Sequence, residues 1–284
     1  MGATGWALAS AFFGGLGVVL QQKGTMQAPE AGSGGFVASI VRSPVWLAGG
    51  ACQFGCWACQ GLALAKGPLA LVQPLISLQI VNALPLGVAI TSQHVGRREW
   101  LGAAFVVAGV TAFVAATNPA AGRETAPSNT WLVASGVVAS LAAAAAIVGS
   151  RRLPAMKAAF FGATAGMLFG YQAAVMKMFV AVAPNGVHAI LSSWSTYALI
   201  VSALGGFYFL QTALQIGVLA PAIATSNAAC PITSVVLGRV IFLETPQRTT
   251  GGKVVSAVSA ALLLAGLVLF ASREEAPSRH TADV

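Results

Sequence analysis

The sequence predicts an all-α polytopic membrane protein. Of its 284 residues, 57% are hydrophobic and only 8% are charged, and the mean hydropathy is +0.80. A soluble domain has about 25% charged residues, so an ordinary soluble fold is excluded. Apolar runs recur along the chain with the length of about 20 residues that a helix needs to cross the hydrocarbon core. We therefore expect about nine transmembrane helices.

Short links separate most of the expected helices, and two longer links over 23–44 and 118–129 are rich in Gly, Pro, Ala and Ser. No basic region precedes the first apolar run, so we interpret that run as a membrane helix rather than a signal peptide. The polar tail over 272–284 is expected to be disordered. The nine expected spans cover roughly 4–22, 45–65, 68–92, 100–117, 130–149, 158–179, 193–214, 219–243 and 252–271.

Two proline-bearing segments of equal length indicate an internal repeat. The segment 66–94 corresponds without gaps to 216–244, so that Gly67 matches Gly217 (217 − 67 = 150) and His94 matches Glu244 (244 − 94 = 150). Helices one to four are thus expected to resemble helices six to nine, with helix five as a spacer. Five crossings separate the copies, which makes the repeat inverted, as in many secondary transporters. The expected organisation is a first repeat over 1–117, a linker and spacer helix over 118–157, and a second repeat over 158–271.

Both repeated segments carry prolines and amides at membrane depth, where such groups are tolerated only against protein or a watery cavity. We interpret them as walls of a solute pathway between helices one, three, six and eight. For any single amide the alternative is an ordinary hydrogen bond between helices. The expected pathway residues are Gln73, Gln79, Asn82, Tyr171, Gln172, Lys177, Ser226 and Asn227, and the expected bends, about which gates would move, are Pro74, Pro85, Pro221 and Pro231.

The ionisable residues narrow the expected chemistry. Lys177 lies in the apolar run AAVMKMFVAVA, where an ammonium must face an aqueous cavity, pair with another group or snorkel. No acidic residue lies in the middle of an apolar run, which argues against a central proton-coupling carboxylate and against a carboxylate ring for cations. His94 and Glu244 form the polar pair at the repeat ends. We expect His94 in a surface turn, and Glu244 with Arg248, four residues on, stabilising a helix end.

No enzyme motif is present in the sequence: GxSxG, P-loop and HExxH patterns are all missing. We expect no catalytic residues and no cofactor. Three of the four cysteines, Cys52, Cys56 and Cys59, share one helical stripe. They are expected to be small packing residues rather than metal ligands, and no disulfide framework is implied.

The basic residues and one glycine stripe bear on partners and topology. The net charge of +8 is spread over short turns, which is typical of topology signals and contact with anionic lipid, so nucleic acid is not an expected partner. The distribution of the Lys and Arg residues between the two sides favours an outside N-terminus and a cytoplasmic C-terminus in the cell membrane. Gly162, Gly166 and Gly170 permit close helix contact, which we expect within one chain, with a homodimer as the alternative.

Two stretches resemble the ends of the repeats in a known superfamily. They are LGRVIFLETPQRTTGGKVV (237–255) and GVAITSQHVGRREWLGAAF (87–105), each a third helix followed by a turn and a glycine-bearing fourth helix. On these residues the chain resembles the drug/metabolite transporter superfamily (DMT, EamA-like). The nine expected helices, WLAGG (46–50), PLALVQPL (68–75) and FLQTALQIGVLAPAIA (209–224) more narrowly resemble its NIPA-like magnesium transporter branch.

The resemblance implies alternating-access transport of a small solute, but three acidic positions depart from it. In the first copy Gln93 and His94 replace the acidic residue that usually follows the third helix, and around Gly217 the acid of the magnesium branch is missing. The first helix also lacks the Glu of small multidrug exporters. Because magnesium prefers carboxylate oxygen, we predict transport of an organic metabolite or drug-like compound. The alternatives are a magnesium or other divalent-cation transporter and a non-transporting membrane scaffold.

Overall fold

The computed structural model describes residues 1–27, 42–91, 96–117, 120, 122–123, 125–216 and 219–245, and three single positions further on. Within these ranges the chain is helical, with turns and short links and no β-strand. The expected ninth span over 252–271 lies outside the described residues apart from those three positions. His94, Arg248 and the polar tail lie outside them as well.

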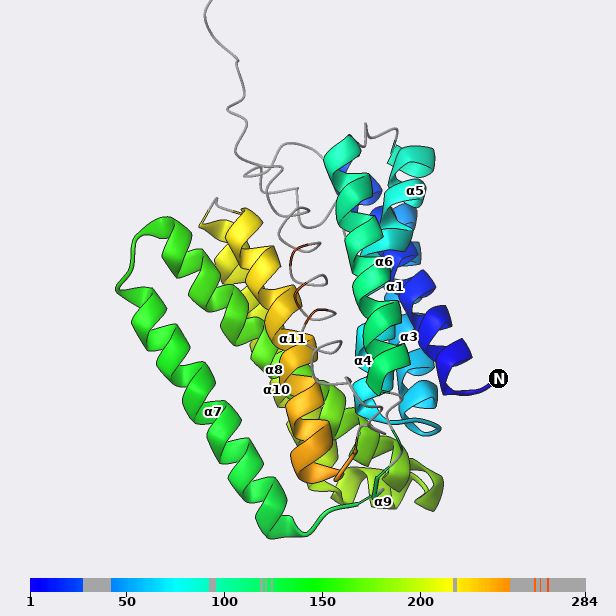
Figure 1. Ribbon diagram of the computed structural model, residues 1–284, viewed down its shortest axis with the longest axis vertical. Helices are drawn as coiled ribbons and strands as arrows, with labels where there is room; N and C mark the ends of the chain where they lie inside the picture. Colours follow the sequence, from blue (N-terminus) through cyan, green and yellow to red (C-terminus); the bar gives the residue numbers. More distant parts are fainter. Residues whose placement is uncertain are drawn as a thin grey trace, which may run out of the picture.

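The first part of the chain forms one group of helices (Figure 1). Ser43 begins its second helix: the hydroxyl accepts a hydrogen bond from the amide of Trp46 at 3.4 Å, and Pro44 occupies the first helical position. The first helix packs against the second and against both short helices that follow it. The members are α1 (Ala3–Met26), α3 (Pro44–Leu64), α4 (Leu69–Ile76), α5 (Gln79–Thr91) and α6 (Arg97–Thr117).

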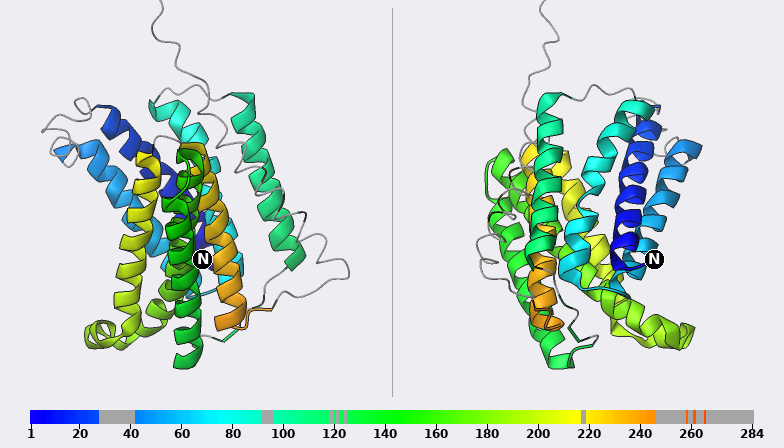
Figure 2. Two further views of the ribbon diagram at one scale, coloured as in Figure 1. Left: turned by 90° about the vertical axis from the view of Figure 1, so that its left-hand side faces the viewer. Right: turned by 45° about the vertical axis from the view of Figure 1, so that its right-hand side comes forward.

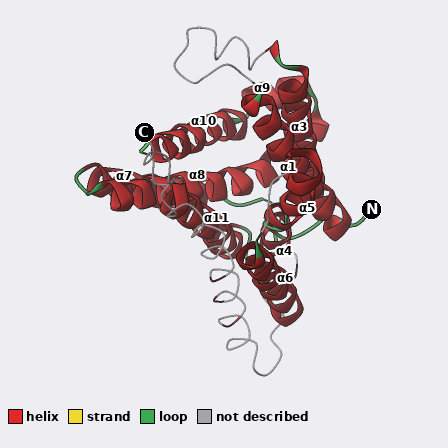
Figure 3. Cartoon of the chain, turned by 90° about the horizontal axis from the view of Figure 1, so that it is seen from above, coloured by secondary structure: helices red, strands yellow, loops and turns green. Residues whose placement is uncertain are grey.

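The second part of the chain forms a neighbouring group around one long helix (Figure 3). This central helix, α8, packs against α7, α10 and α11. The members are α7 (Ser128–Ser150), α8 (Pro154–Val182), the short 3-10 helix η1 (Ala183–Asn185), α9 (Val187–Ser192), α10 (Trp194–Gln215) and α11 (Leu219–Ile241). The two groups meet where α4 contacts α8 and α11, and where α3 contacts α8.

Five of the described helical segments are long and apolar enough to cross a membrane, which supports a polytopic membrane protein. Large apolar side chains such as Leu132 (76% exposed) and Val201 (70% exposed) cover their outer surface, as expected where lipid is the solvent. The helix α3 falls outside the five because its Gln and Gly residues lower its hydropathy. The five are Ala3–Gly24, Leu69–Thr91, Ser128–Ser150, Met156–Asn185 and Trp194–Ala213, with a shorter apolar stretch at Trp100–Val114.

The third expected span is interrupted, because α4 ends at Ile76 and α5 begins at Gln79. The backbone between them makes tight turns: the amide of Leu78 donates to the carbonyl of Leu75 at 3.2 Å. Figure 1 labels α4 and α5 in the first group. The interruption lies between the two expected bend positions, Pro74 and Pro85, and coincides with neither.

The other expected bends lie inside continuous helices. Pro74 and Pro85 are internal to α4 and α5, and Pro231 is internal to α11, which runs on to Ile241. Pro221 belongs to the first turn of α11, where a missing amide hydrogen costs little because that turn has unpaired donors anyway. The gating role of these four residues stays a prediction.

The glycine stripe of α8 lies directly on the backbone of α11, and Figure 2 shows the two helices side by side. A Cβ atom added at Gly162 would meet the carbonyl oxygen of Ala222, and one at Gly166 would meet that of Ser226. At Gly170 the added atom would lie 2.6 Å from the carbonyl oxygen of Cys230. Close packing within one chain is therefore confirmed for this stripe, which is not free to form a dimer.

Candidate functional site

The site begins with a sharp turn directly after α11. The carbonyl of Gly238 accepts hydrogen bonds from the amides of Phe242 and Glu244, each at 3.1 Å. Between them Leu243 has φ of 55°, a left-handed conformation that is uncommon for a residue other than glycine. The turn brings the Glu244 side chain back into the protein, where the residue is 3% exposed.

Glu244 connects three separate parts of the chain. Its Oε1 accepts from Lys177 Nζ at 2.6 Å and from the amide of Leu69 at 2.7 Å, and its Oε2 accepts from the amide of Ala70 at 3.0 Å. Leu69 and Ala70 are the first two residues of α4, which Pro68 precedes without any side-chain cap. A carboxylate is favourable there because the first amides of a helix are unpaired and its dipole is positive at that end. Glu244 thus caps a helix of the other group.

Lys177 comes to this carboxylate from α8. Its side chain is 10% exposed, and its Nζ lies 4.4 Å from the centroid of the Phe242 ring, a cation–π contact. A lysine in an apolar run can face an aqueous cavity, pair with another group or snorkel, and in the structure the Lys177 ammonium is paired. The pairing offsets the cost of taking an ammonium out of water, about 2.5–3.5 kcal/mol at the centre of a membrane helix.

An aromatic cluster packs against Phe242, the ring that contacts the Lys177 ammonium. The Trp131 ring of α7 packs edge-on against Phe242 at 5.8 Å, against Tyr171 at 6.5 Å and against Trp194 at 5.0 Å between centroids. The Tyr171 hydroxyl is 2.7 Å from the Ser135 hydroxyl. Apolar rings lower the local dielectric constant and strengthen an ion pair between them.

Two further residues fix the turn that carries Glu244. A Cβ atom on Gly238 would lie 2.6 Å from Glu244 Oε2, so this position must be glycine for the carboxylate to occupy its place. Arg123, in the link before α7, donates from Nε to the carbonyl of Ile241 at 2.6 Å and from its amide to the carbonyl of Phe242 at 2.8 Å. A basic group at the carboxyl end of α11 also suits the helix dipole.

The structure separates the expected pathway residues into several places. Gln79 and Asn82, at the start of α5, pack on Gly14 and Gly15 of α1. Gln73 is buried in α4 at 5% exposure. The remaining members divide between α8 and α11: Tyr171 faces Ser135, Lys177 pairs with Glu244, Ser226 is buried, and Gln172 and Asn227 are half-buried.

The expected partner of Glu244, Arg248, lies outside the described residues, so their pairing stays a prediction. Glu244 follows α11, which ends at Ile241, and its carboxylate stabilises the beginning of α4. Sequence reasoning missed the amides of Leu69 and Ala70 and the indole of Trp131. One signal was available: pairing with an anion is one of the states open to a lysine within an apolar run, and Glu244 directly follows the next proline-bearing run.

Comparison with known proteins gives one relative of similar length. The chain is 26% identical over 242 residues to an uncharacterized protein of Corynebacterium glutamicum, and the match covers 84% of each of the two chains. No family model matches the chain, and no solved structure matches it. The ion pair and the interrupted span therefore have to be interpreted from their own chemistry.

Proposed function

We propose that this protein is a secondary transporter of the drug/metabolite type, which moves a small solute by alternating access between two inverted halves. The observation that carries the proposal is the bond network of Glu244. It ties Lys177 of α8 and the turn after α11 to the first helix of an interrupted membrane span. A structural anchor or scaffold has no need to bury a charged pair at such a junction.

The interrupted span supports transport. Transporters commonly place their solute site where a membrane helix is broken, with helix ends directed at the bound groups. The break in this span falls at Ser77 and Leu78, directly after α4. The start of the same short helix lies between the two groups of helices, and its first amides bond to Glu244. A helix start directed at an anionic group is the arrangement that such solute sites use.

The packing pattern supports the inverted repeat. In the first group α1 contacts α3 and α5, and in the second group α8 contacts α10 and α11. The spans expected as first and sixth each contact the two spans that follow them, which is the pattern that a repeat would produce. The four spans expected to line the pathway are in contact, since α4 packs on α1, α8 and α11.

In the proposed cycle the Glu244 network is a latch between the two groups. With the latch formed, the start of α4 is held against the turn after α11, and this end of the pathway is closed. Rupture of the three bonds releases α4 and opens that end. The left-handed turn at Leu243 and the bonds from Arg123 keep the carboxylate in place for reclosure.

An organic solute suits this site better than a divalent cation. Both oxygens of Glu244 already accept hydrogen bonds, one of them from an ammonium that neutralises its charge. Magnesium prefers anionic oxygen ligands and keeps several waters. Within the described residues no group of three or more His, Cys, Asp or Glu side chains is placed to hold a metal. Magnesium transport remains the second candidate, resting on the sequence resemblance alone.

Uptake into proteoliposomes tests the proposal. The purified full-length chain is offered a panel of labelled metabolites and, in parallel, magnesium. We expect uptake of at least one organic solute, and its loss when Lys177→Gln breaks the latch. Lys66→Gln, an exposed lysine in the link before α4, is the matched control and should retain uptake. Magnesium flux that Glu244→Gln abolishes would support the cation alternative, and no flux of any solute would contradict transport.

A further inference from the structure

We propose that the Lys177–Glu244 site binds the carboxylate of an organic anion and that Glu244 is the built-in competitor for this place. The inference rests on the proposed transport function and names the class of its substrate. The solute's carboxylate would take the position of the Glu244 carboxylate, on Lys177 Nζ and on the amides of Leu69 and Ala70.

The donor set of the site fits a carboxylate. Lys177 Nζ and the amides of Leu69 and Ala70 converge on the two oxygens of one group, at 2.6, 2.7 and 3.0 Å. All three are hydrogen-bond donors, and two belong to the positive end of a helix. Without the Glu244 side chain, the place that these donors surround would attract an external anion of the same shape.

Two more buried donors near the site have no acceptor. Gln73 Nε2 and Trp131 Nε1 are buried side-chain nitrogens without a hydrogen-bond partner, in residues that are 5% and 4% exposed. Leaving such a group unpaired is costly, so it calls for a specific explanation. Gln73 follows Leu69 by four residues on the same face of α4. Trp131 packs on Phe242, whose ring makes the cation–π contact with the Lys177 ammonium.

Both unpartnered groups are donors, so the ligand that satisfies them must bring acceptors. An organic anion with a second oxygen, such as a hydroxy or oxo acid, supplies a carboxylate for Lys177 and further acceptors for these nitrogens. A cation would add to the charge of Lys177 and would leave the two donors unpaired. The chemistry of the site therefore favours a carboxylate-bearing solute over both a cation and an apolar drug.

Competition for one place would couple binding to opening. A carboxylate that occupies the three donors displaces Glu244, and the turn after α11 then loses its bonds to α4. Lys177 keeps one anionic partner before and after the exchange, and the displaced Glu244 carboxylate has to leave its buried place, which moves the turn after α11. Binding of the solute anion and release of the latch become a single event, which is the differential interaction that a ligand-driven conformational change requires.

Chemical rescue of the full-length protein in detergent tests the site. Removing the competitor with Glu244→Ala leaves Lys177 buried and unpaired, and we expect a lowered melting temperature. Sodium acetate should raise the melting temperature of Glu244→Ala, whereas acetamide and sodium chloride at equal concentration should not. The double variant Lys177→Met/Glu244→Ala, which has no buried charge to neutralise, should show no acetate effect.

The affinity for acetate should depend on whether the Glu244 carboxylate competes for the same three donors. Acetate should bind Glu244→Ala about tenfold or more tightly than it binds the wild type, since the latter must first release its own carboxylate. Equal stabilisation of the double variant, or no stabilisation of Glu244→Ala by acetate, would overturn the carboxylate site. Uptake of a neutral solute together with a failed rescue would leave the transport proposal intact and reject this one. Rescue by acetate without uptake of any solute would support the carboxylate site and contradict the transport proposal.

Discussion

The charge of Lys177 is balanced at one atom, Oε1 of Glu244, and both residues are almost completely buried. Removing one member of a buried pair leaves the other charge uncompensated, which costs about 3–5 kcal/mol. We predict that Lys177→Met lowers the free energy of unfolding by this amount, measured by denaturant titration in mixed micelles. Lys66→Met, at an exposed lysine, is the matched control and should change little.

The double variant Lys177→Met/Glu244→Gln separates charge from packing. With both charges removed, most of the lost stability should return, because a neutral pair has no buried charge to desolvate. A double variant as unstable as Lys177→Met would show that the packing of the lysine chain, and not the ion pair, holds this junction.

The left-handed conformation of Leu243 gives a second prediction at this scale. That conformation costs an L-residue about 1–2 kcal/mol, and the cost is highest for β-branched residues. Glycine, which has no Cβ atom, adopts it without this cost. The Leu243 side chain is 56% exposed, so its loss removes little packing. We expect Leu243→Gly to keep the melting temperature of the wild type and Leu243→Val to lower it. If the two variants unfold at the same temperature, the turn does not need its left-handed geometry to place Glu244.

Sequence analysis predicted each member of the pair without predicting the pair. Lys177 was expected to face an aqueous cavity, pair with another group or snorkel, and Glu244 was recognised as a residue at a repeat end. The two are 67 positions apart, and their contact depends on a left-handed residue that is a leucine, a type that gives no signal for such a turn. The amides of Leu69 and Ala70 are backbone groups, which residue types do not reveal as ligands.

At the scale of elements, the contact between α8 and α11 depends on glycine. A Cβ atom at Gly166 would meet the carbonyl oxygen of Ser226, which belongs to the backbone of the next helix. Overpacking of this kind costs about 1–3 kcal/mol. We predict that Gly166→Ala lowers the melting temperature, whereas Gly136→Ala in α7, with open space around the added atom, does not. Equal melting temperatures for the two variants would show that the helices separate without cost.

The lengths of most described helices were predictable, whereas the interruption of the third span was not. Spans such as 130–149 and 193–214 agree closely with Ser128–Ser150 and Trp194–Gln215, because the thickness of the membrane fixes the length of an apolar run. Prolines marked the region from Pro74 to Pro85 as irregular. The break itself falls at Ser77 and Leu78, residue types that give no signal for a helix end at this place.

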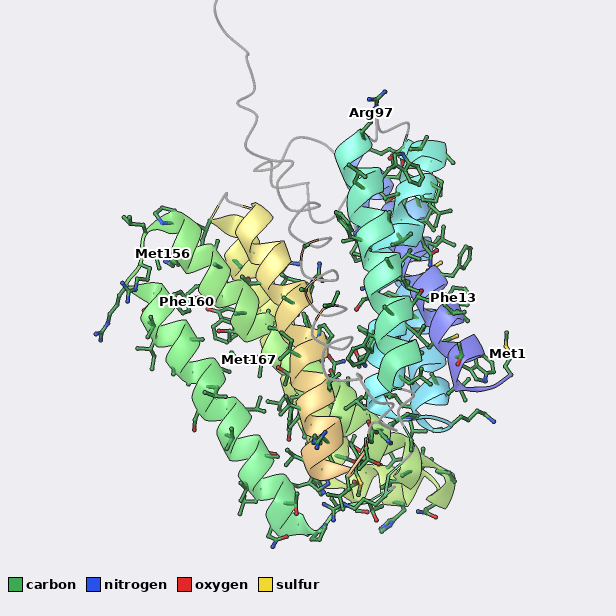
Figure 4. The ribbon with its side chains drawn as sticks, in the orientation of Figure 1. Met1, Phe13, Arg97, Met156, Phe160 and Met167 are labelled. Carbon is green, nitrogen blue, oxygen red and sulfur yellow. The ribbon has the colours of Figure 1, made fainter. Side chains whose placement is uncertain are left out.

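At the scale of the whole molecule, the proposed orientation makes a prediction about two turns. The turn after α7 and the short helix η1 lie at opposite ends in Figure 1, and Figure 4 shows Met156 and Arg97 toward the same upper end. The proposed orientation puts this end, with Arg97, on the cytoplasmic side. In a cysteine-free background, Arg152→Cys should resist an impermeant maleimide in intact cells, and Asn185→Cys should react. Both positions are exposed, so the opposite labelling pattern would invert the topology.

Alternating access requires the two groups of helices to move against each other, and the contact of α3 with α8 offers a place to prevent it. A Cβ atom at Gly61 of α3 would lie 3.2 Å from a methyl group of Val180 in α8. Cysteines at these two positions are within the reach of a disulfide or a short bifunctional cross-linker. In a background lacking the native cysteines, we predict that cross-linking Gly61→Cys to Val180→Cys stops solute uptake and that reduction restores it.

The single-cysteine variants, treated in the same way, are the controls and should keep their uptake, because a modified side chain alone does not join the groups. Mass spectrometry measures the cross-linked fraction, and the lost uptake should equal that fraction. Full cross-linking with unchanged uptake would mean that α3 and α8 move as one body. The moving boundary would then have to lie elsewhere, and the bonds of Glu244 to α4, which join the same two groups, would hold a permanent junction instead of a latch.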